Sequence, residues 1–175
     1  LRALVGHWRF KVPAGARTVA IAHAFIAGGT ESESERPLSV GGSGVVDGRI
    51  FAPFTYTALG HLHNAQPAGA DNIRYPGSLL KYSFAEAGQK KGVNLVEIGG
   101  DGQVAVRGIP LTPRHEVRCL DGWFADLLNG PAAGEPADDY IMVTVRDREP
   151  LLDARGRLQK VYPNILHLER PGRPA

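Results

Sequence analysis

The first part of the chain alternates short apolar runs with loops rich in glycine and serine. Residues 17–25, Arg-Thr-Val-Ala-Ile-Ala-His-Ala-Phe, form one such run, bounded by Gly15 and by Gly28-Gly29. The length and the flanking glycines predict a buried strand rather than a helix. Residues 54–60 form a second run, β-branched and aromatic, which predicts a strand that leads directly into His61.

Two further strands are predicted before residue 110. Residues 91–98 and 103–109 are joined by Gly99-Gly-Asp-Gly102, which is typical of a hairpin turn. Between the second and third strands, Pro76-Gly77 is placed for a type II turn. The pattern up to Pro110 therefore predicts strands and loops almost throughout.

The pattern changes after residue 110. Residues 114–120 are predicted to form a strand, and Asp121 is placed to cap a short helix over 122–129 that stops at Gly130. The helical spacing puts three apolar side chains on one face, those of Trp123, Leu127 and Leu128.

A second strand and helix follow. Residues 140–145 alternate as a strand, and either Asp147 or Glu149 is placed to open a helix that Pro163 ends. Residues 164–168 form the last predicted strand. The order β-α-β-α-β predicts a small α/β domain over 111–175, after a first domain over 1–110.

Composition limits the classes of protein. The chain has 175 residues, 43% of them hydrophobic, so a globular fold is expected rather than disorder. No apolar run approaches the roughly 20 residues that span a bilayer. With 20 Lys and Arg against 18 Asp and Glu, the net charge of +2 indicates no strong partner. The single cysteine, Cys119, excludes an internal disulfide framework and fits a cytoplasmic protein.

The pair His61-x-His63 at the end of a predicted strand is the clearest chemical signal. Residues two apart in an extended chain point to the same side, with Cα atoms roughly 6.6 Å apart. Two such imidazoles suit one metal ion or a pair of ions. Gly60 is expected to allow the chain to turn sharply away from the sheet. Spacing alone leaves open that both are surface histidines.

His23 is a second candidate, because it interrupts an apolar strand near its C-terminal end, although a lone histidine in such a run is more often part of the core. His7, His115 and His167 are interpreted as structural or surface residues. A hydrolytic pair of metal ions normally needs a bridging carboxylate. None of the early acidic residues has a pattern typical of a ligand: Glu31, Glu33, Glu35, Asp47, Asp71, Glu86, Glu97 and Asp101.

Aromatic and basic residues alternate over 74–91, where Tyr75 and Tyr82 lie among Arg74, Lys81 and Lys91. Such interleaving can bind nucleic acid, but the interpretation favoured by composition is a sheet edge with lysines extended into solvent. No Walker A loop, dinucleotide-binding glycine fingerprint, Gly-x-Ser-x-Gly elbow or Cys-x-x-Cys occurs.

Several segments, in order, resemble the SbcD family, the nuclease subunits of bacterial SbcCD complexes within the calcineurin-like metallophosphoesterases. Gly60-His-Leu-His63 marks only the superfamily. Two other segments are more specific and narrow the resemblance from the superfamily to the SbcD family. They are Ser34-Glu-Arg-Pro-Leu38 and Arg74-Tyr-Pro-Gly-Ser-Leu-Leu-Lys-Tyr-Ser-Phe84. The remaining similar segments are Ala22-His-Ala-Phe-Ile-Ala-Gly-Gly29, Lys91-Gly-Val-Asn-Leu-Val96 and residues 140–169.

The resemblance implies the C-terminal part of a metallophosphoesterase β-sandwich, followed by a capping domain. By resemblance, His23 and His61 would serve one cation and His63 another, most often Mn2+. Family members cleave DNA ends as exonucleases and single strands or hairpins as endonucleases, in repair, replication and recombination. They work with an SbcC-type ATPase, commonly as a homodimer within a heterotetramer. The resemblance therefore implies a hydrolase with DNA and an ATPase as partners.

The chain departs from the family at its beginning. The family's first motifs, Asp-x-His, Gly-Asp-x-x-Asp and Gly-Asn-His-Glu, do not occur, so catalytic residues are expected upstream of Leu1. We expect this chain alone to have little or no nuclease activity. The sequence leaves two alternatives open: a phosphoesterase for small nucleotides, and a non-catalytic DNA-binding or ATPase-adaptor subunit with an incomplete metal site.

Overall fold

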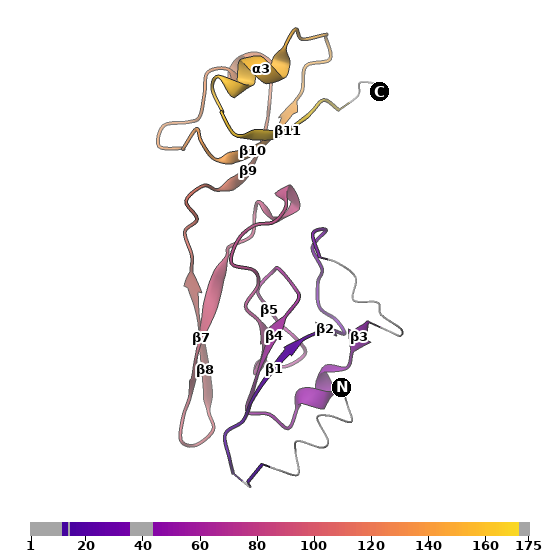
Figure 1. Cartoon of the computed structure of the whole chain (residues 1–175), viewed down its shortest axis with the longest axis vertical. Helices are drawn as coiled ribbons and strands as arrows, with labels where there is room; N and C mark the ends of the chain where they lie inside the picture. Colours follow the sequence, from indigo (N-terminus) through magenta and orange to yellow (C-terminus); the bar gives the residue numbers. More distant parts are fainter. Residues whose placement is uncertain (1–11, 14, 36–43, 172–175) are drawn as a thin grey trace. The chain divides into compact units, whose positions relative to one another are not determined.

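The computed structural model describes residues 12–13, 15–35 and 44–171, which form two units (Figure 1). The first unit comprises residues up to Leu80 together with Gln89–Thr112, and the second comprises Lys81–Gly88 and the residues from Pro113 onward. The described chain is mixed α/β, as predicted. The more specific metallophosphoesterase sandwich, and the family assignment of domains 1–110 and 111–175, stay predictions.

The first unit is built on a sheet of four strands in the order β1-β4-β6-β5. Strands β1 (Val19–His23), β4 (Tyr56–Gly60) and β6 (Ile73–Tyr75) are parallel, and β5 (Gln66–Pro67) is antiparallel to β6. A parallel pair, β2 (Phe25–Ile26) and β3 (Val45–Val46), precedes the 3-10 helix η1 (Gly48–Phe51).

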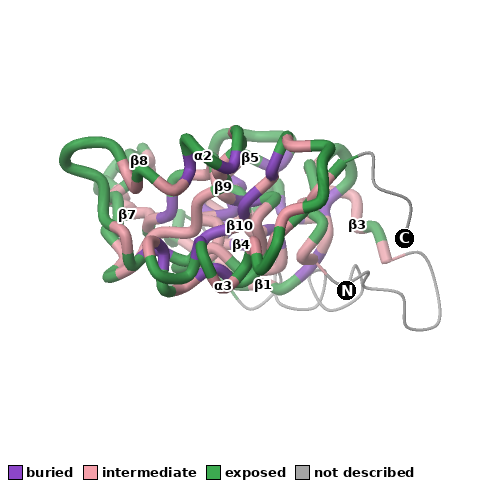
Figure 2. Tube along the Cα trace, turned by 90° about the horizontal axis from the view of Figure 1, so that it is seen from above, coloured by how far each residue is buried: buried purple, intermediate pink, exposed green. Residues whose placement is uncertain are grey.

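The predicted hairpin of the first unit is confirmed. Strands β7 (Gly92–Ile98) and β8 (Val104–Pro110) pair antiparallel from Gly92↔Pro110 to Ile98↔Val104. At the turn, Gly102 has φ 82°, a left-handed conformation that glycine adopts without steric cost. Figure 2 shows the loop of this hairpin as exposed.

The core of the first unit includes one tyrosine that joins separate strands. Tyr75 is 1% exposed, and its hydroxyl donates to the carbonyl of Ala24 at 2.7 Å and accepts from the amide of Ile26 at 3.0 Å. These two backbone groups lie where β1 gives way to β2, so Tyr75 supplies hydrogen bonds that neither strand pairing provides there. Leu59, Leu62 and Ile73 are also buried in this cluster.

The prediction of a buried strand at 17–25 is correct for one face only. Ala20 and Ala22 pack against the core, whereas Val19 and Ile21 are 53% and 86% exposed. Alternate side chains of a strand point to opposite faces, and within the described residues β1 pairs with β4 alone. A run of apolar letters therefore predicted the strand correctly and its burial only in part.

The second unit has the predicted order of strands and helices. Strands β9 (Val117–Gly122), β10 (Tyr140–Val145) and β11 (Ile165–Glu169) form a parallel sheet in the order β11-β10-β9. Helix α2 (Phe124–Leu127) links β9 to β10, and α3 (Ala154–Gln159) links β10 to β11. The 3-10 helix η2 (Phe84–Glu86) contacts β9. Buried side chains of this unit form one apolar core: Phe124, Leu127, Ile141, Val143, Val145, Leu158, Tyr162 and Ile165.

The first predicted helix is capped differently from the prediction. Asp121 lies in β9 and pairs with Arg146, and the amide of Phe124 at the start of α2 donates instead to Asp147 at 2.7 Å. Trp123, expected on the core face, is 54% exposed, and Phe124 is buried in its place. A carboxylate distant in sequence therefore caps α2. Gly130, with φ 91°, follows the helix as expected.

The second helix also begins later than predicted. Its N-cap is Asp153, whose side chain accepts from the amide of Gly156 at 3.2 Å, so neither Asp147 nor Glu149 opens it. The strand prediction for 164–168 agrees with β11. No helix among the described residues is long and apolar enough to cross a membrane.

Candidate metal centre

Two of the three predicted ligands lie at the C-terminal ends of neighbouring parallel strands. In the β1–β4 ladder His23 is paired with Gly60, so the residue after Gly60, His61, lies next to His23. The two imidazole rings form an edge-on contact with centroids 5.5 Å apart and planes at 67°. The carboxyl ends of parallel strands are a common place for ligands to bind, and the sheet brings His23 and His61 together there.

The chain turns away from the sheet at His61 itself. His61 has φ 117°, a conformation that L residues rarely adopt. Gly60, which was expected to provide this turn, does not have a positive φ. A Cβ at Gly60 would lie 2.9 Å from Nδ1 of His23. Gly60 therefore leaves the space that the His23 ring occupies.

The ring of His61 contains an unpartnered polar atom. Its Nε2 is buried and has no hydrogen-bond partner among the described residues, and Phe25 packs edge-on against the ring at a centroid distance of 6.1 Å. Burial lowers the pKa of His61, the neighbouring His23 lowers it further, and Glu35 and Glu31 oppose this. Burial thus favours the neutral imidazole, which is the form that binds a cation.

His63 is held at its ring and at its main chain. Its Nδ1 forms a hydrogen bond of 2.8 Å with Oγ of Ser34, and its backbone amide donates to the carboxylate of Glu35. His63 is two residues from His61, and its charge is one of the causes that lower the pKa of His61. All three predicted histidines thus belong to one neighbourhood of the first unit.

The acidic residues of this neighbourhood do not form a ligand set with the histidines. Glu35, which was not predicted to act here, accepts backbone amides from Ser32 and His63 through its two oxygens. Among the described residues, His23, His61 and His63 form no group of three whose ligand atoms lie within 4.8 Å of one another. The described part of the chain therefore supplies imidazoles without a bridging carboxylate.

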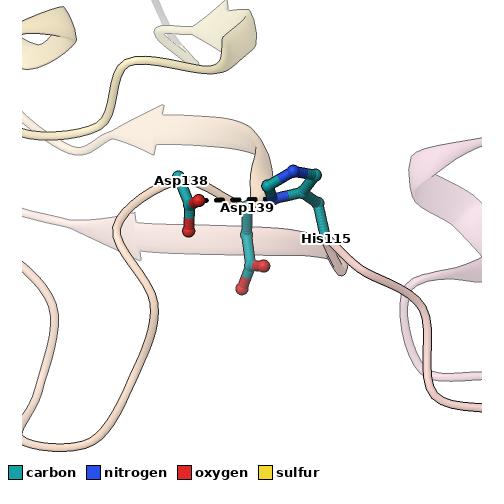
Figure 3. A group of neighbouring side chains, drawn as sticks. All are labelled: His115, Asp138 and Asp139. Carbon is teal, nitrogen blue, oxygen red and sulfur yellow. Dashed lines mark ion pairs between the residues drawn. The ribbon is translucent and has the colours of Figure 1, made fainter.

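One group in the second unit does satisfy that distance, and the sequence analysis did not predict it. His115, Asp138 and Asp139 place their ligand atoms within 4.8 Å of one another (Figure 3). His115 pairs with Asp138 at 3.4 Å, and the buried Asp139 accepts the amide of Glu116 at 2.8 Å and pairs with Arg118 at 2.8 Å. Because Arg118 already balances Asp139, we interpret this group as an ion-pair network at the start of β9 and β10.

Outside the three-histidine group, one histidine lies at the surface and two lysines are largely buried. His167 is half-exposed and pairs with Glu169 at 3.2 Å, in line with a surface role, and His7 lies outside the described residues, as do 36–42 of the similar segments. The prediction of solvent-extended lysines is wrong for Lys91, which is 8% exposed. In the second unit Lys81 is also mostly buried, where it donates to the carbonyl of Ala87 at 2.7 Å and pairs with Glu116.

Comparison with protein families gives a match in the second unit. Residues 113–175 match the model of the SbcD C-terminal domain, which is described as the type 5 capsule protein repressor C-terminal domain. The matched segment contains the whole of β9-α2-β10-α3-β11. It covers the region in which the sequence predicted the capping domain. The match confirms the resemblance over these residues, so the second unit of the chain carries an SbcD C-terminal domain.

Proposed function

We propose that the chain is part of a metal-dependent DNA nuclease subunit of the SbcD type, in which His23, His61 and His63 are metal ligands. The observation that carries this proposal is the buried Nε2 of His61, which has no hydrogen-bond partner in the described part of the chain, on a ring that contacts the ring of His23. A buried polar atom without a partner costs free energy unless something satisfies it. A cation bound there would satisfy this atom.

The residues have distinct roles in this proposal. His23 and His61, whose rings are in contact, hold one cation, and His63 holds the other. Imidazole nitrogen together with oxygen ligands suits Mn2+ better than a thiolate shell would. A bound metal pair supplies an activated water and stabilises charge on the phosphate. The residues themselves orient the site: Gly60 admits the His23 ring, and His61, which follows it, has a left-handed backbone conformation.

The fold and the partners belong to the same proposal. The parallel strands β1, β4 and β6 fit the C-terminal part of a metallophosphoesterase sandwich, and the family match supports association with an SbcC-type ATPase. The substrate is DNA, cleaved at ends and in single strands or hairpins, in repair, replication and recombination. A homodimer within a heterotetramer follows from the same resemblance, and a cytoplasmic location fits the single cysteine, Cys119.

The proposal is tested by Mn2+ titration of the full 175-residue chain, with free Mn2+ measured by electron paramagnetic resonance. We expect binding that His61→Ala weakens at least tenfold, whereas His167→Ala, a half-exposed histidine of the second unit, leaves it unchanged. Equal binding by wild type and His61→Ala would contradict the metal site. The same preparation should cleave DNA weakly or not at all, because no described carboxylate completes the three-histidine group. Mn2+-dependent cleavage by the chain alone would refute that expectation.

The absence of a carboxylate from the described three-histidine group also favours a second function, a DNA-binding or ATPase-adaptor subunit without catalysis. The two functions differ in what His61→Ala and His63→Ala do in a protein that includes any upstream region. An enzyme loses cleavage and keeps its ATPase partner, whereas an adaptor loses neither DNA binding nor partner binding.

A further inference from the structure

Lys91 lies inside the first unit although its side chain carries a charge. The residue is 8% exposed, and the oxygens that accept from its ammonium group include the carbonyl of His63 at 2.9 Å, Oγ of Ser78 at 2.7 Å and Oε1 of Gln89 at 2.7 Å. An ammonium is a donor without acceptor capacity, so each of these contacts is a hydrogen bond that Lys91 donates. Burying a charge is costly without such bonds, so the environment of Lys91 is closely specified.

Two of these acceptors, the carbonyl of His63 and the hydroxyl of Ser78, lie at the peptide group that follows His63. That carbonyl also accepts from the amide of Ser78 at 3.0 Å. Ser78 follows Gly77, which has φ 84°, and a Cβ at Gly77 would lie 2.9 Å from the same carbonyl. The turn at 76–78 and the ammonium of Lys91 therefore approach the His63 peptide together.

Separate contacts hold the other side of His63. Glu35 accepts its backbone amide, and Ser34 is hydrogen-bonded to Nδ1 of its ring at 2.8 Å. When Nδ1 carries the proton and donates it to the Ser34 hydroxyl, Nε2 is left with the lone pair that a cation needs. Partners of this kind on the second ring nitrogen commonly fix the tautomer of metal-binding histidines.

We propose that Lys91 and Ser34 are positioning residues for His63. Lys91 fixes the main chain of His63 through its carbonyl, and Ser34 fixes the orientation and tautomer of its ring so that Nε2 keeps the lone pair that a cation would need. This inference rests on the proposed metal site, and it assigns a task to segments around Ser34, Pro76-Gly77 and Lys91 that the resemblance marked without explaining.

The test uses the full chain with 15N-labelled histidine and compares Lys91→Met and Ser34→Ala with Lys90→Met. Lys90 is the exposed neighbour of Lys91, so its replacement makes the same change in charge without touching His63. In the metal-free protein we expect both variants to shift the ring resonances of His63 and to leave those of His167 in place. Lys90→Met should shift neither.

Mn2+ titration provides a second, independent readout. We expect Lys91→Met and Ser34→Ala to weaken binding about tenfold to a hundredfold, the usual effect of losing a partner of a ligand. Unshifted His63 resonances in both folded variants would overturn the positioning proposal. If Lys91→Met does not fold, the proposal is judged on Ser34→Ala alone, and unshifted His63 resonances in that variant would overturn it. If His63 shifts while the wild type binds no Mn2+, the metal site fails and the positioning of His63 stands.

Discussion

A Cβ added to Gly60 would lie 2.9 Å from Nδ1 of His23, its partner in the β1–β4 ladder. Real Cβ atoms essentially never come so close to a side-chain atom. The glycine thus fits the ring of His23, and its backbone does not require the left-handed conformation. Its neighbour His61 adopts that conformation instead, with φ 117°.

Gly60→Ala is therefore expected to displace the ring of His23 and to disturb its contact with His61. Because the backbone of residue 60 tolerates alanine and His23 is exposed, we expect a change in unfolding free energy of only about 0.5 kcal/mol. Mn2+ binding should weaken about tenfold or more. Histidine-labelled NMR spectra together with Mn2+ titration measure both effects.

Gly108→Ala is the matched control for this prediction. Gly108 also lies within a strand, β8, and a Cβ there meets nothing within 4 Å. It should leave the histidine resonances and the affinity for Mn2+ as in the wild type. Equal affinities of Gly60→Ala and wild type would mean that the position of the His23 ring does not matter for binding.

Tyr75→Phe is expected to weaken the place where β1 gives way to β2. The change removes only the hydroxyl and leaves the buried carbonyl of Ala24 and the buried amide of Ile26 without their partner. Leaving buried groups unpaired costs about 1–3 kcal/mol. Hydrogen exchange resolved by residue should show faster exchange of the Ile26 amide. The exposed tyrosine of the second unit offers a control, because Tyr140→Phe should not alter that rate.

Asp147→Ala is expected to destabilise the second unit by about 1 kcal/mol, because it removes the acceptor for the first amide of α2. Asp121→Ala should cost less, since Asp121 pairs with Arg146 in an exposed position where ion pairs contribute little. Urea unfolding followed by residue-resolved NMR within the second unit compares the two. A larger loss from Asp121→Ala would restore the capping assignment that the sequence suggested.

The thiol of Cys119 is expected to react slowly with iodoacetamide. Desolvation raises its pKa, and the carboxylate of Glu169 raises it further. Because the thiolate is the reactive form, the rate near neutral pH should fall below that of a free thiol and continue to rise at more alkaline pH. Cys119 is the single cysteine, so mass spectrometry reports one site. The chain unfolded in urea serves as the reference, and an equal rate in that state would refute the prediction.

Local pattern predicted much of the secondary structure. Runs of β-branched and aromatic residues gave β4, β7 and β10, and the change from strand to mixed pattern gave the order β9-α2-β10-α3-β11. These features depend on residues a few positions apart, so the sequence displays them directly. Helix starts were less predictable, because the carboxylate that caps α2, Asp147, comes from beyond β10.

In the candidate site too, the local sequence predicted the residues, whereas their contacts depend on the tertiary structure. A pair of histidines two residues apart identified His61 and His63, and interruption of an apolar run identified His23. The contact between His23 and His61 depends on the strand register that pairs His23 with Gly60. That register joins residues far apart in the chain, so the spacing of nearby residues does not reveal it. The burial of Lys91 against the His63 carbonyl, and the group of His115, Asp138 and Asp139, likewise join positions far apart in the chain.

The chemical types of the ligands, the strands that carry them and the order of elements were thus already present in the amino-acid sequence, because period and residue type are local properties. Tertiary structure decided which of these groups meet, which acids remain available and which charges are buried. Those outcomes depend on strand register and on competition among donors and acceptors: the Glu35 carboxylate accepts the amides of Ser32 and His63, and the Lys91 ammonium donates to the His63 carbonyl.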